Sequence, residues 1–231
     1  MRRSRPPAAV PVPFSPSAAR AHRAGLGLTP EQVAQGMAAH GVRLLPTHVL
    51  GWESGELRPG EEEFIALARA LWCPAAQLMG APPASLRDYR LARELSRQQA
   101  AERLGLSPRA YAAVELSGRW SGDEAQSAAL AELLGMTLRE LVRVTGVADE
   151  LERRLRQCVD GRWQAQLKPL ARLVPVPRAT LAAVLAALQD GYQVHSYWGS
   201  STPAEPVGAE EPPLERFWAL LAERDTGGLP V

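Results

Sequence analysis

A series of helical signals occurs twice within the first 147 residues, and this internal repeat limits the fold more than any other feature of the chain. The segment LTPEQVA from Leu28 returns as LSRQQAA from Leu95, 67 residues later. Glu53 in VLGWESG pairs with Glu115 at an offset of 62, and EEFIALARALW returns as AQSAALAELLG at an offset of 63. The first copy therefore has about five extra residues between its second and third helices, in AAHGVRLL. Two tandem copies of one small fold are expected.

Each copy has the pattern of five short helices. In the first copy, Thr29 is expected to cap a helix that starts at Pro30 and ends at Gly41, because these residue types favour those places. A short helix is predicted from Pro46 to Ser54. The longer EEEFIALARALWC carries apolar residues at i, i+3, i+4 and i+7, and PAAQLMG adds one more turn. The sequence predicts an all-α fold.

The remainder of the chain surrounds the repeat with less regular segments. Prolines near the amino end favour a disordered basic arm, and ADELERRLRQCVDG, RWQAQLKPLARLV and RATLAAVLAALQDGY predict a helical carboxy-terminal region. GSSTPAEPVGAEEPP is typical of a linker, and LERFWALLAERD of a final amphipathic helix. The expected boundaries are 1–16 for the arm, 17–80 and 86–147 for the two copies, 148–198 for the helical region, 199–213 for the linker, 214–224 for the terminal helix and 225–231 for the tail.

Charge is distributed unevenly along the chain. The formal net charge of +1 comes from 26 basic and 25 acidic residues, and this total neither favours nor excludes nucleic acid. The first 27 residues hold five arginines and no acid, so the amino end is basic. Lys168 is the only lysine, which together with abundant alanine and proline indicates the codon bias of a GC-rich genome. An arginine alone is therefore not read as a phosphate-binding signal.

Several classes of protein are disfavoured by residues that the sequence lacks. Cys73 and Cys158 form no CxxC pair, and no disulfide framework is expected. No stretch approaches the roughly 18 apolar residues of a membrane span, and prolines interrupt any signal-peptide core. His22, His40 and His195 lack ligand spacing, Glu61 to Glu63 open a helix as capping residues, and no catalytic pattern occurs. We expect a cytoplasmic protein that is not an enzyme and has no cofactor or metal.

The segment LSRQQAAERLGLSPRAYAAVELSG has the spacing of a helix-turn-helix. Gly105 permits the left-handed turn, Ser107 caps the next helix, and Ala101 lets two helices cross closely. The first copy ends its third helix with Trp52, Glu53, Gly55 and Pro59, followed by FIALARAL. The series resembles the Cro and phage-repressor type of bacterial transcriptional regulator, the xenobiotic-response-element (XRE) family. The resemblance covers roughly residues 17–147.

This resemblance implies that the third helix of each copy reads the major groove and that the second helix meets phosphate. Trp52 and Glu53 would then be structural, and Arg43, Arg58 and Arg119 in loops would hold the DNA backbone. Arginines of the amino arm would enter a minor groove. The residues at the matching positions, expected to contact double-stranded DNA, are Glu31, Gln32, Pro46, Thr47, His48, Leu50 and Gly51 in the first copy and Arg97, Gln98, Pro108, Arg109, Ala110, Ala112 and Ala113 in the second.

Departures from the family pattern keep a second function open. Both third helices begin with proline and carry few long polar side chains, and the second has Val114 where the first has Trp52. The first hypothesis is a sequence-specific DNA-binding regulator that acts as a homodimer. The alternative is a protein-interaction adaptor that keeps the fold without specific DNA readout.

The carboxy-terminal helices also allow two interpretations. Their apolar stripes favour an oligomerisation unit. The alternative is a pocket for a protein or small-molecule effector, lined by Trp163, Tyr192, Tyr197 and Trp198.

Overall fold

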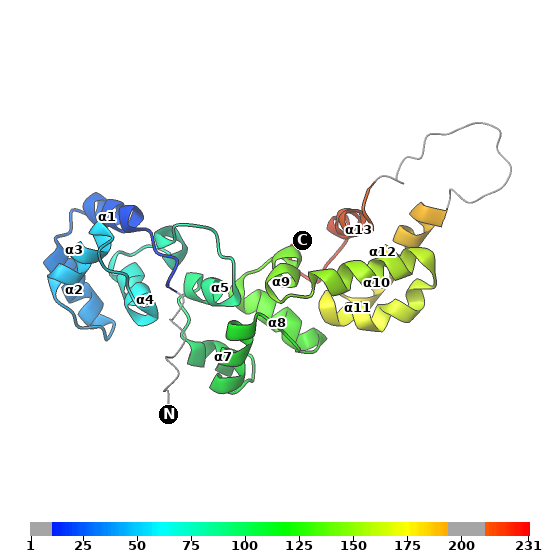
Figure 1. Cartoon of the computed structure of the whole chain (residues 1–231), viewed down its shortest axis with the longest axis horizontal. Helices are drawn as coiled ribbons and strands as arrows, with labels where there is room; N and C mark the ends of the chain where they lie inside the picture. Colours follow the sequence, from blue (N-terminus) through cyan, green and yellow to red (C-terminus); the bar gives the residue numbers. More distant parts are fainter. Residues whose placement is uncertain (1–10, 194–210) are drawn as a thin grey trace, which may run out of the picture. The chain divides into compact units, whose positions relative to one another are not determined.

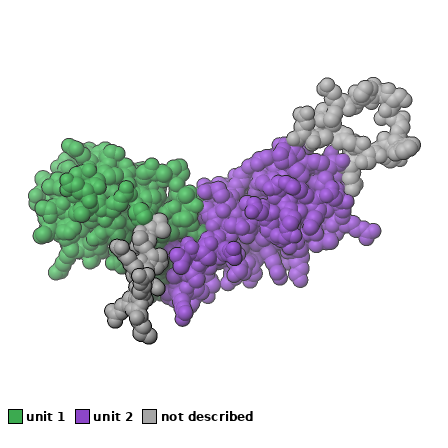
Figure 2. Space-filling model, in the orientation of Figure 1, with its two compact units in different colours: residues 1–102 green, residues 103–231 purple. Residues whose placement is uncertain are grey.

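The computed structural model describes residues 11–193 and 211–231, which form thirteen α-helices and two short 3₁₀ turns (Figure 1). These ranges contain no strand, only an isolated antiparallel bridge between Phe14 and Met79. The all-α prediction is confirmed. The chain divides into two compact units, residues 1–102 and 103–231, which Figure 2 colours separately.

Unit 1 contains the first copy of the repeat and the start of the second. Capping explains several of its helix boundaries, because Ser15, Thr29 and Ser85 each accept a hydrogen bond from a backbone N–H three residues later. The elements of unit 1 are α1 (Pro16–Gly25), α2 (Pro30–Ala39), α3 (Pro46–Ser54), α4 (Glu61–Ala70), η1 (Ala75–Leu78), α5 (Leu86–Ala92) and all but the last residue of α6 (Arg97–Arg103).

The core of unit 1 is formed where α2 packs against α3 and α4 while α1 packs against α3 and η1. Met37, Trp52, Phe64 and Leu67 are buried there, as the apolar spacing of these helices requires. The expected disordered arm through residue 16 is wrong for its last residues. Val12 and Phe14 belong to this core, and Phe14 meets Phe64 edge-on with ring centroids 6.4 Å apart. Burial of these two side chains offsets the entropy of ordering the proline-rich segment.

Unit 2 holds the remainder of the second copy and the carboxy-terminal helices. Ser107, Asp123 and Thr137 cap three of its helices, and Gly118 and Gly135 end two of them in the left-handed conformation. The elements of unit 2 are α7 (Pro108–Ser117), α8 (Glu124–Leu134), α9 (Leu138–Val144), α10 (Ala148–Asp160), η2 (Trp163–Gln166), α11 (Leu167–Leu173), α12 (Arg178–Gln193) and α13 (Pro213–Ala222).

The carboxy-terminal helices of unit 2 bury one another's apolar stripes. Contacts join α10, α12 and α13 in every pair, and α11 packs against α8 and α12. Leu155, Leu185 and Phe217 are fully buried. The last residues also belong to the unit, since Leu229 is buried and the Leu138 N–H donates to the Pro230 carbonyl oxygen over 2.7 Å. These stripes, which favoured oligomerisation in the sequence, are thus covered within the chain itself.

The backbone repeats where the sequence does. Pro46 of α3 and Pro108 of α7 begin their helices 62 residues apart, as the sequence offset predicts. Helix ends recur as well, because each copy stops its helices with a residue of positive φ. The matched stops are Gly27 and Glu94, Gly41 and Gly105, Gly55 and Gly118, and Trp72 and Gly135.

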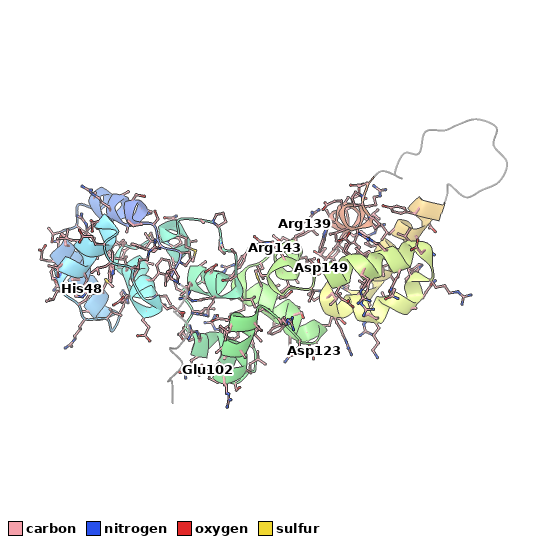
Figure 3. The ribbon with its side chains drawn as sticks, in the orientation of Figure 1. His48, Glu102, Asp123, Arg139, Arg143 and Asp149 are labelled. Atoms are coloured by element: carbon pink, nitrogen blue, oxygen red, sulfur yellow. The ribbon has the colours of Figure 1, made fainter. Side chains whose placement is uncertain are left out.

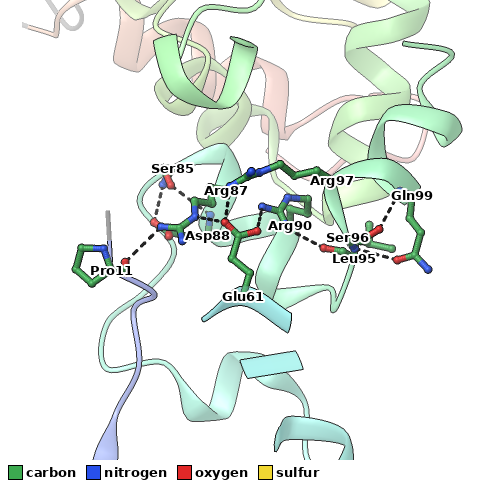
Figure 4. A network of polar contacts seen from close by, with 10 residues as sticks. All are labelled: Pro11, Glu61, Ser85, Arg87, Asp88, Arg90, Leu95, Ser96, Arg97 and Gln99. Carbon is green, nitrogen blue, oxygen red and sulfur yellow. Dashed lines mark hydrogen bonds and ion pairs between the residues drawn. The ribbon is translucent and has the colours of Figure 1, made fainter. Parts of the chain in front are cut away.

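The compact units divide inside α6 and not at the segment 81–85 that separates the two expected domains. Glu61 of α4 explains why α5 stays with the first copy. Its carboxylate accepts hydrogen bonds from Arg87 (2.7 Å), Arg90 (2.6 Å) and Arg97 (2.6 Å), all from the second copy (Figure 4). Leu91 of α5 also lies in the core of unit 1. Glu61 was expected only to cap its helix, whereas Glu63 is the residue that accepts the Gly60 N–H at 2.6 Å.

Candidate nucleic-acid interface

In the α2–turn–α3 segment two helices pack against each other and are joined by a six-residue turn, as the predicted helix-turn-helix requires. Thr29 and Gln32 form a capping box at the start of α2, with the Gln32 side-chain oxygen accepting the Thr29 N–H at 2.8 Å. The helix ends at Ala39, Gly41 in the following turn has a φ of 86°, and the Val42 N–H donates to the Met37 carbonyl oxygen. The chain then enters α3 at Pro46. The turn has six residues, against four between α6 and α7, and α2 is three residues longer than α6, so the five extra residues that the sequence offsets predicted are divided between the helix and the turn.

The inner side of α3 is anchored by two buried side chains and one ion pair. Val49 and Trp52 are almost fully buried in the core of unit 1. The Glu53 carboxylate accepts hydrogen bonds from Arg23 Nε (2.6 Å) and Nη2 (2.7 Å), and Arg23 Nη1 donates to the Leu28 carbonyl oxygen (2.9 Å). The hydrogen bond to Glu53 raises the pKa of Arg23 against the opposing effect of burial. These contacts hold α3 to α1 in a defined orientation.

The outer side of α3 presents Thr47, Leu50 and Ser54, which lie on one helical face. His48 is half-buried, with its Nδ1 atom 3.3 Å from the Leu45 carbonyl oxygen; Figure 3 labels it on this helix. The expected contact of Gly51 with DNA is wrong for this geometry. Gly51 is buried because the Leu57 side chain folds over it, so closely that a Cβ atom there would lie 2.7 Å from Leu57 Cδ1.

Leucines surround the outward face of α3. Leu45, Leu50 and Leu57 are 65%, 49% and 46% exposed, although leucine is a residue that proteins usually bury. Leu50 and Leu57 line a surface hollow together with Thr47, Glu56 and Arg20. Arg20 was not among the residues expected to contact DNA, because the sequence analysis counted it only as one of the five arginines of the basic amino end. Its position on α1, which packs against α3, brings it to this face.

Charged residues flank α3 on both sides. Arg43 lies three residues before the helix and Arg58 four residues after its end, and both are exposed. Glu31 at the start of α2 and Glu56 after α3 are exposed as well. Arg23 neutralises Glu53 through their ion pair. The other charged side chains named around α3 are three exposed arginines (Arg20, Arg43 and Arg58) and two exposed glutamates, so together they carry one excess positive charge.

Two residues expected to meet phosphate in the second copy have protein partners. Arg97 binds Glu61 at 2.6 Å, and the Gln98 amide donates to Glu102 at 2.9 Å. The Arg97 side chain remains 52% exposed, and its phosphate contact stays a prediction. Its guanidinium belongs to the Glu61 cluster, because a carboxylate on the neighbouring α4 is within hydrogen-bonding distance.

The third helix of the second copy, α7, is more exposed than α3. Gly105 has a φ of 65° in the turn, and Ser107 accepts the Ala110 N–H at 3.2 Å. Tyr111 is the residue of α7 that is fully buried. Arg109, Ala110 and Arg119 are exposed, as a role in contacting DNA requires.

An arginine that donates to a backbone carbonyl oxygen five residues later recurs in both copies, and the sequence patterns did not predict it. Arg90 is fully buried and donates to the Leu95 carbonyl oxygen at 2.8 Å, as Arg23 does to Leu28 at 2.9 Å. Arg23 and Arg90 are 67 residues apart, and so are Leu28 and Leu95. This is the offset of the aligned LTPEQVA and LSRQQAA segments. Extending that alignment five residues towards the amino terminus would have identified the pair.

The expected effector pocket is described only in part. Trp163 is half-buried, and the Tyr192 hydroxyl donates to the Glu211 carbonyl oxygen. Tyr197 and Trp198 lie outside the described residues. Among the residues described, no His, Cys, Asp and Glu side chains gather as a metal site would require. None of the described helices combines the length and apolar character needed to cross a membrane.

Comparisons with protein-family models, with curated proteins and with solved structures gave no match to this chain.

Proposed function

We propose that the chain is a sequence-specific DNA-binding transcriptional regulator whose first copy inserts α3 into the major groove. One observation carries this proposal. Val49, Trp52 and the Arg23–Glu53 pair hold the inner side of α3, while Thr47 and Leu50 remain exposed on its outer side. A helix anchored in this way can enter a groove about 12 Å wide without loss of its own packing.

Phosphate contacts in this proposal come from Arg43 and Arg58, with Arg20 beside them. Their guanidinium groups are exposed at the two ends of α3, and guanidinium binds phosphate oxygens through paired hydrogen bonds. The near-neutral net charge of +1 implies modest non-specific affinity. Specific binding must then depend on a few well-placed contacts.

The second copy contributes through Arg109 and Arg119 in this proposal, and both are exposed at the two ends of α7. A homodimer is a further part of it, implied by the family resemblance, since repressor-type proteins pair recognition helices about 34 Å apart. The apolar stripes of α10 and α12 do not supply its interface, because α13 covers them. Light scattering of the full chain with and without bound DNA measures this state directly.

A protein-interaction adaptor is the second candidate, and the exposed leucines favour it. Leu45, Leu50 and Leu57 present apolar area where a base-reading helix usually carries amides or guanidiniums. The measurable property that separates the two functions is DNA sequence preference, which the regulator has and the adaptor lacks.

Selection of duplexes from a random-sequence library by the full chain distinguishes these functions. Enrichment of one motif supports the regulator. The Thr47→Ala chain should have a weaker motif preference, whereas Arg43→Ala/Arg58→Ala should weaken binding to all sequences and lower the salt slope by about two. Arg156→Ala, which removes a similarly exposed charge from α10, is the matched control and should change neither. Recovery of fragments without a motif would refute specific regulation and leave the adaptor.

A further inference from the structure

We infer that α3 recognises thymine through apolar contact with its C5-methyl group, with Leu50 as the main contact and Thr47 beside it. This inference rests on the proposed function and adds the class of base that the first copy reads.

The outward stripe of α3 lacks the long side chains that read guanine and adenine through paired hydrogen bonds. Guanine is read by arginine or lysine and adenine by asparagine or glutamine, each through two hydrogen bonds. The stripe of Thr47, Leu50 and Ser54 has none of these residue types. The Ser54 hydroxyl also donates to the Gly51 carbonyl oxygen at 3.1 Å, within its own helix.

The remaining groups on this face match thymine. In the major groove only thymine carries a methyl group, and its distinguishing feature is therefore apolar. Leu50 is half exposed at the centre of the stripe, and its branched side chain ends in two methyl groups. Leu57 packs over Gly51 next to it and widens the apolar surface. Thr47 adds one more methyl group together with a hydroxyl.

The charges around this apolar patch favour DNA over an apolar protein surface as its partner. Arg20 lines the same hollow as Leu50 and Leu57, and Arg43 and Arg58 are exposed at either end of the helix. An apolar centre flanked by guanidinium groups matches the methyl groups of a thymine run between two phosphate backbones. Glu56 opposes this charge from the same hollow.

Deoxyuridine provides the test, because it removes the thymine methyl group and leaves the hydrogen-bonding pattern of the base pair unchanged. The probe is the duplex enriched in the selection described above, with single thymines replaced in turn by deoxyuridine. For the unmodified chain, replacement at a contacted position should weaken binding about three- to fourfold, the equivalent of one buried methyl-sized group.

Three variants show whether the deoxyuridine effect depends on Leu50. In Leu50→Ala the contact is already lost, so the same replacement should have almost no further effect. Leu26→Ala removes a leucine that is 48% exposed on the turn after α1, outside α3, and should respond as the unmodified chain does. Circular dichroism of each variant checks that α3 has folded. Thr47→Val keeps the methyl group of Thr47 and replaces its hydroxyl by a second methyl group, and should keep the deoxyuridine effect.

The outcomes separate the inference from the function on which it depends. A motif with deoxyuridine effects that Leu50→Ala abolishes supports thymine recognition. A motif without such effects, or with equal effects in Leu50→Ala, overturns the inference and leaves the proposed function standing. Absence of any enriched motif overturns both and assigns the leucine face to a protein partner.

Discussion

Arg23 on α1 donates two hydrogen bonds, of 2.6 and 2.7 Å, to the carboxylate of Glu53 on α3. The Glu53 side chain is nearly buried, and the pair joins the helix expected to bind DNA to the first helix of the fold. Because the third guanidinium contact goes to the Leu28 carbonyl oxygen, the same arginine also holds the turn before α2.

Replacing Glu53 by glutamine should destabilise unit 1. The amide keeps the shape but loses the charge that Arg23 requires, and the expected cost is about 2 kcal/mol in the free energy of unfolding. Urea denaturation followed by circular dichroism measures the change. Glu56→Gln, three residues further on an exposed site, is the control and should have an effect near zero. Equal effects of the two substitutions would show that the pair adds no stability.

Trp72 should destabilise the helix end that it occupies. It is 88% exposed and has a φ of 52°, at the position where the second copy has Gly135. A left-handed conformation costs a side-chain-bearing residue roughly 1–2 kcal/mol, and an exposed indole recovers little by burial. Trp72→Gly should therefore raise the stability of unit 1 by about 1 kcal/mol, measured as an increase in Tm.

Trp72→Ala separates strain from exposure. Alanine removes the indole but keeps a Cβ atom, and therefore keeps the strain of positive φ. Its stability should stay close to that of the unmodified chain. A gain equal to that of the glycine variant would mean that the exposed ring, and not the backbone, is unfavourable.

Glu61 should make unit 1 sensitive to acid. Burial acts to raise its pKa, but the hydrogen bonds and charges of Arg87 and Arg90 outweigh burial and hold the pKa below its ordinary value. A carboxyl group whose pKa falls on folding stabilises the folded state above its unfolded value of about 4.3. This contribution is lost as pH falls through the lower folded pKa.

The Glu61→Gln chain measures this contribution. It should be less stable than the unmodified chain by about 2 kcal/mol at neutral pH, and the difference should shrink as pH falls below about 4.3. Denaturation midpoints collected from pH 3 to 7 provide the profile. Glu62→Gln, at the exposed neighbouring position, should follow the unmodified profile throughout. A difference that does not vary with pH would contradict an ionised Glu61 in the folded state.

Both cysteines should be unreactive in the folded chain. Burial raises the pKa of the Cys158 thiol to about 11 despite the opposing charge of Arg154, and burial also raises that of Cys73. At pH 8 only about one Cys158 in a thousand would be a thiolate. Ellman's reagent should therefore detect almost no thiol before denaturation and two afterwards. Cys73→Ala shows which residue is responsible if one reacts early.

The sequence by itself predicted the local elements of the repeat, because their signals involve residues close together in the chain. Thr29 and Ser107 cap helices, and Gly55 and Gly118 end them, through bonds that span only three or four residues. The offsets also predicted the five extra residues between the starts of α2 and α3, although three of them lengthen α2 and only two lengthen the turn. The local backbone preferences that produced these signals are the ones that operate in the folded chain.

Tertiary structure decided the features that depend on residues distant in the sequence. The three arginines at Glu61 come from positions 26 to 36 residues away, and Arg23 meets Glu53 across 30 residues. Leu57 covers Gly51, and Phe14 joins a core that its proline-rich surroundings did not suggest. Helical periodicity shows that a residue faces outward from its own helix. It does not show which neighbour packs there, since that depends on how separate helices are arranged in space.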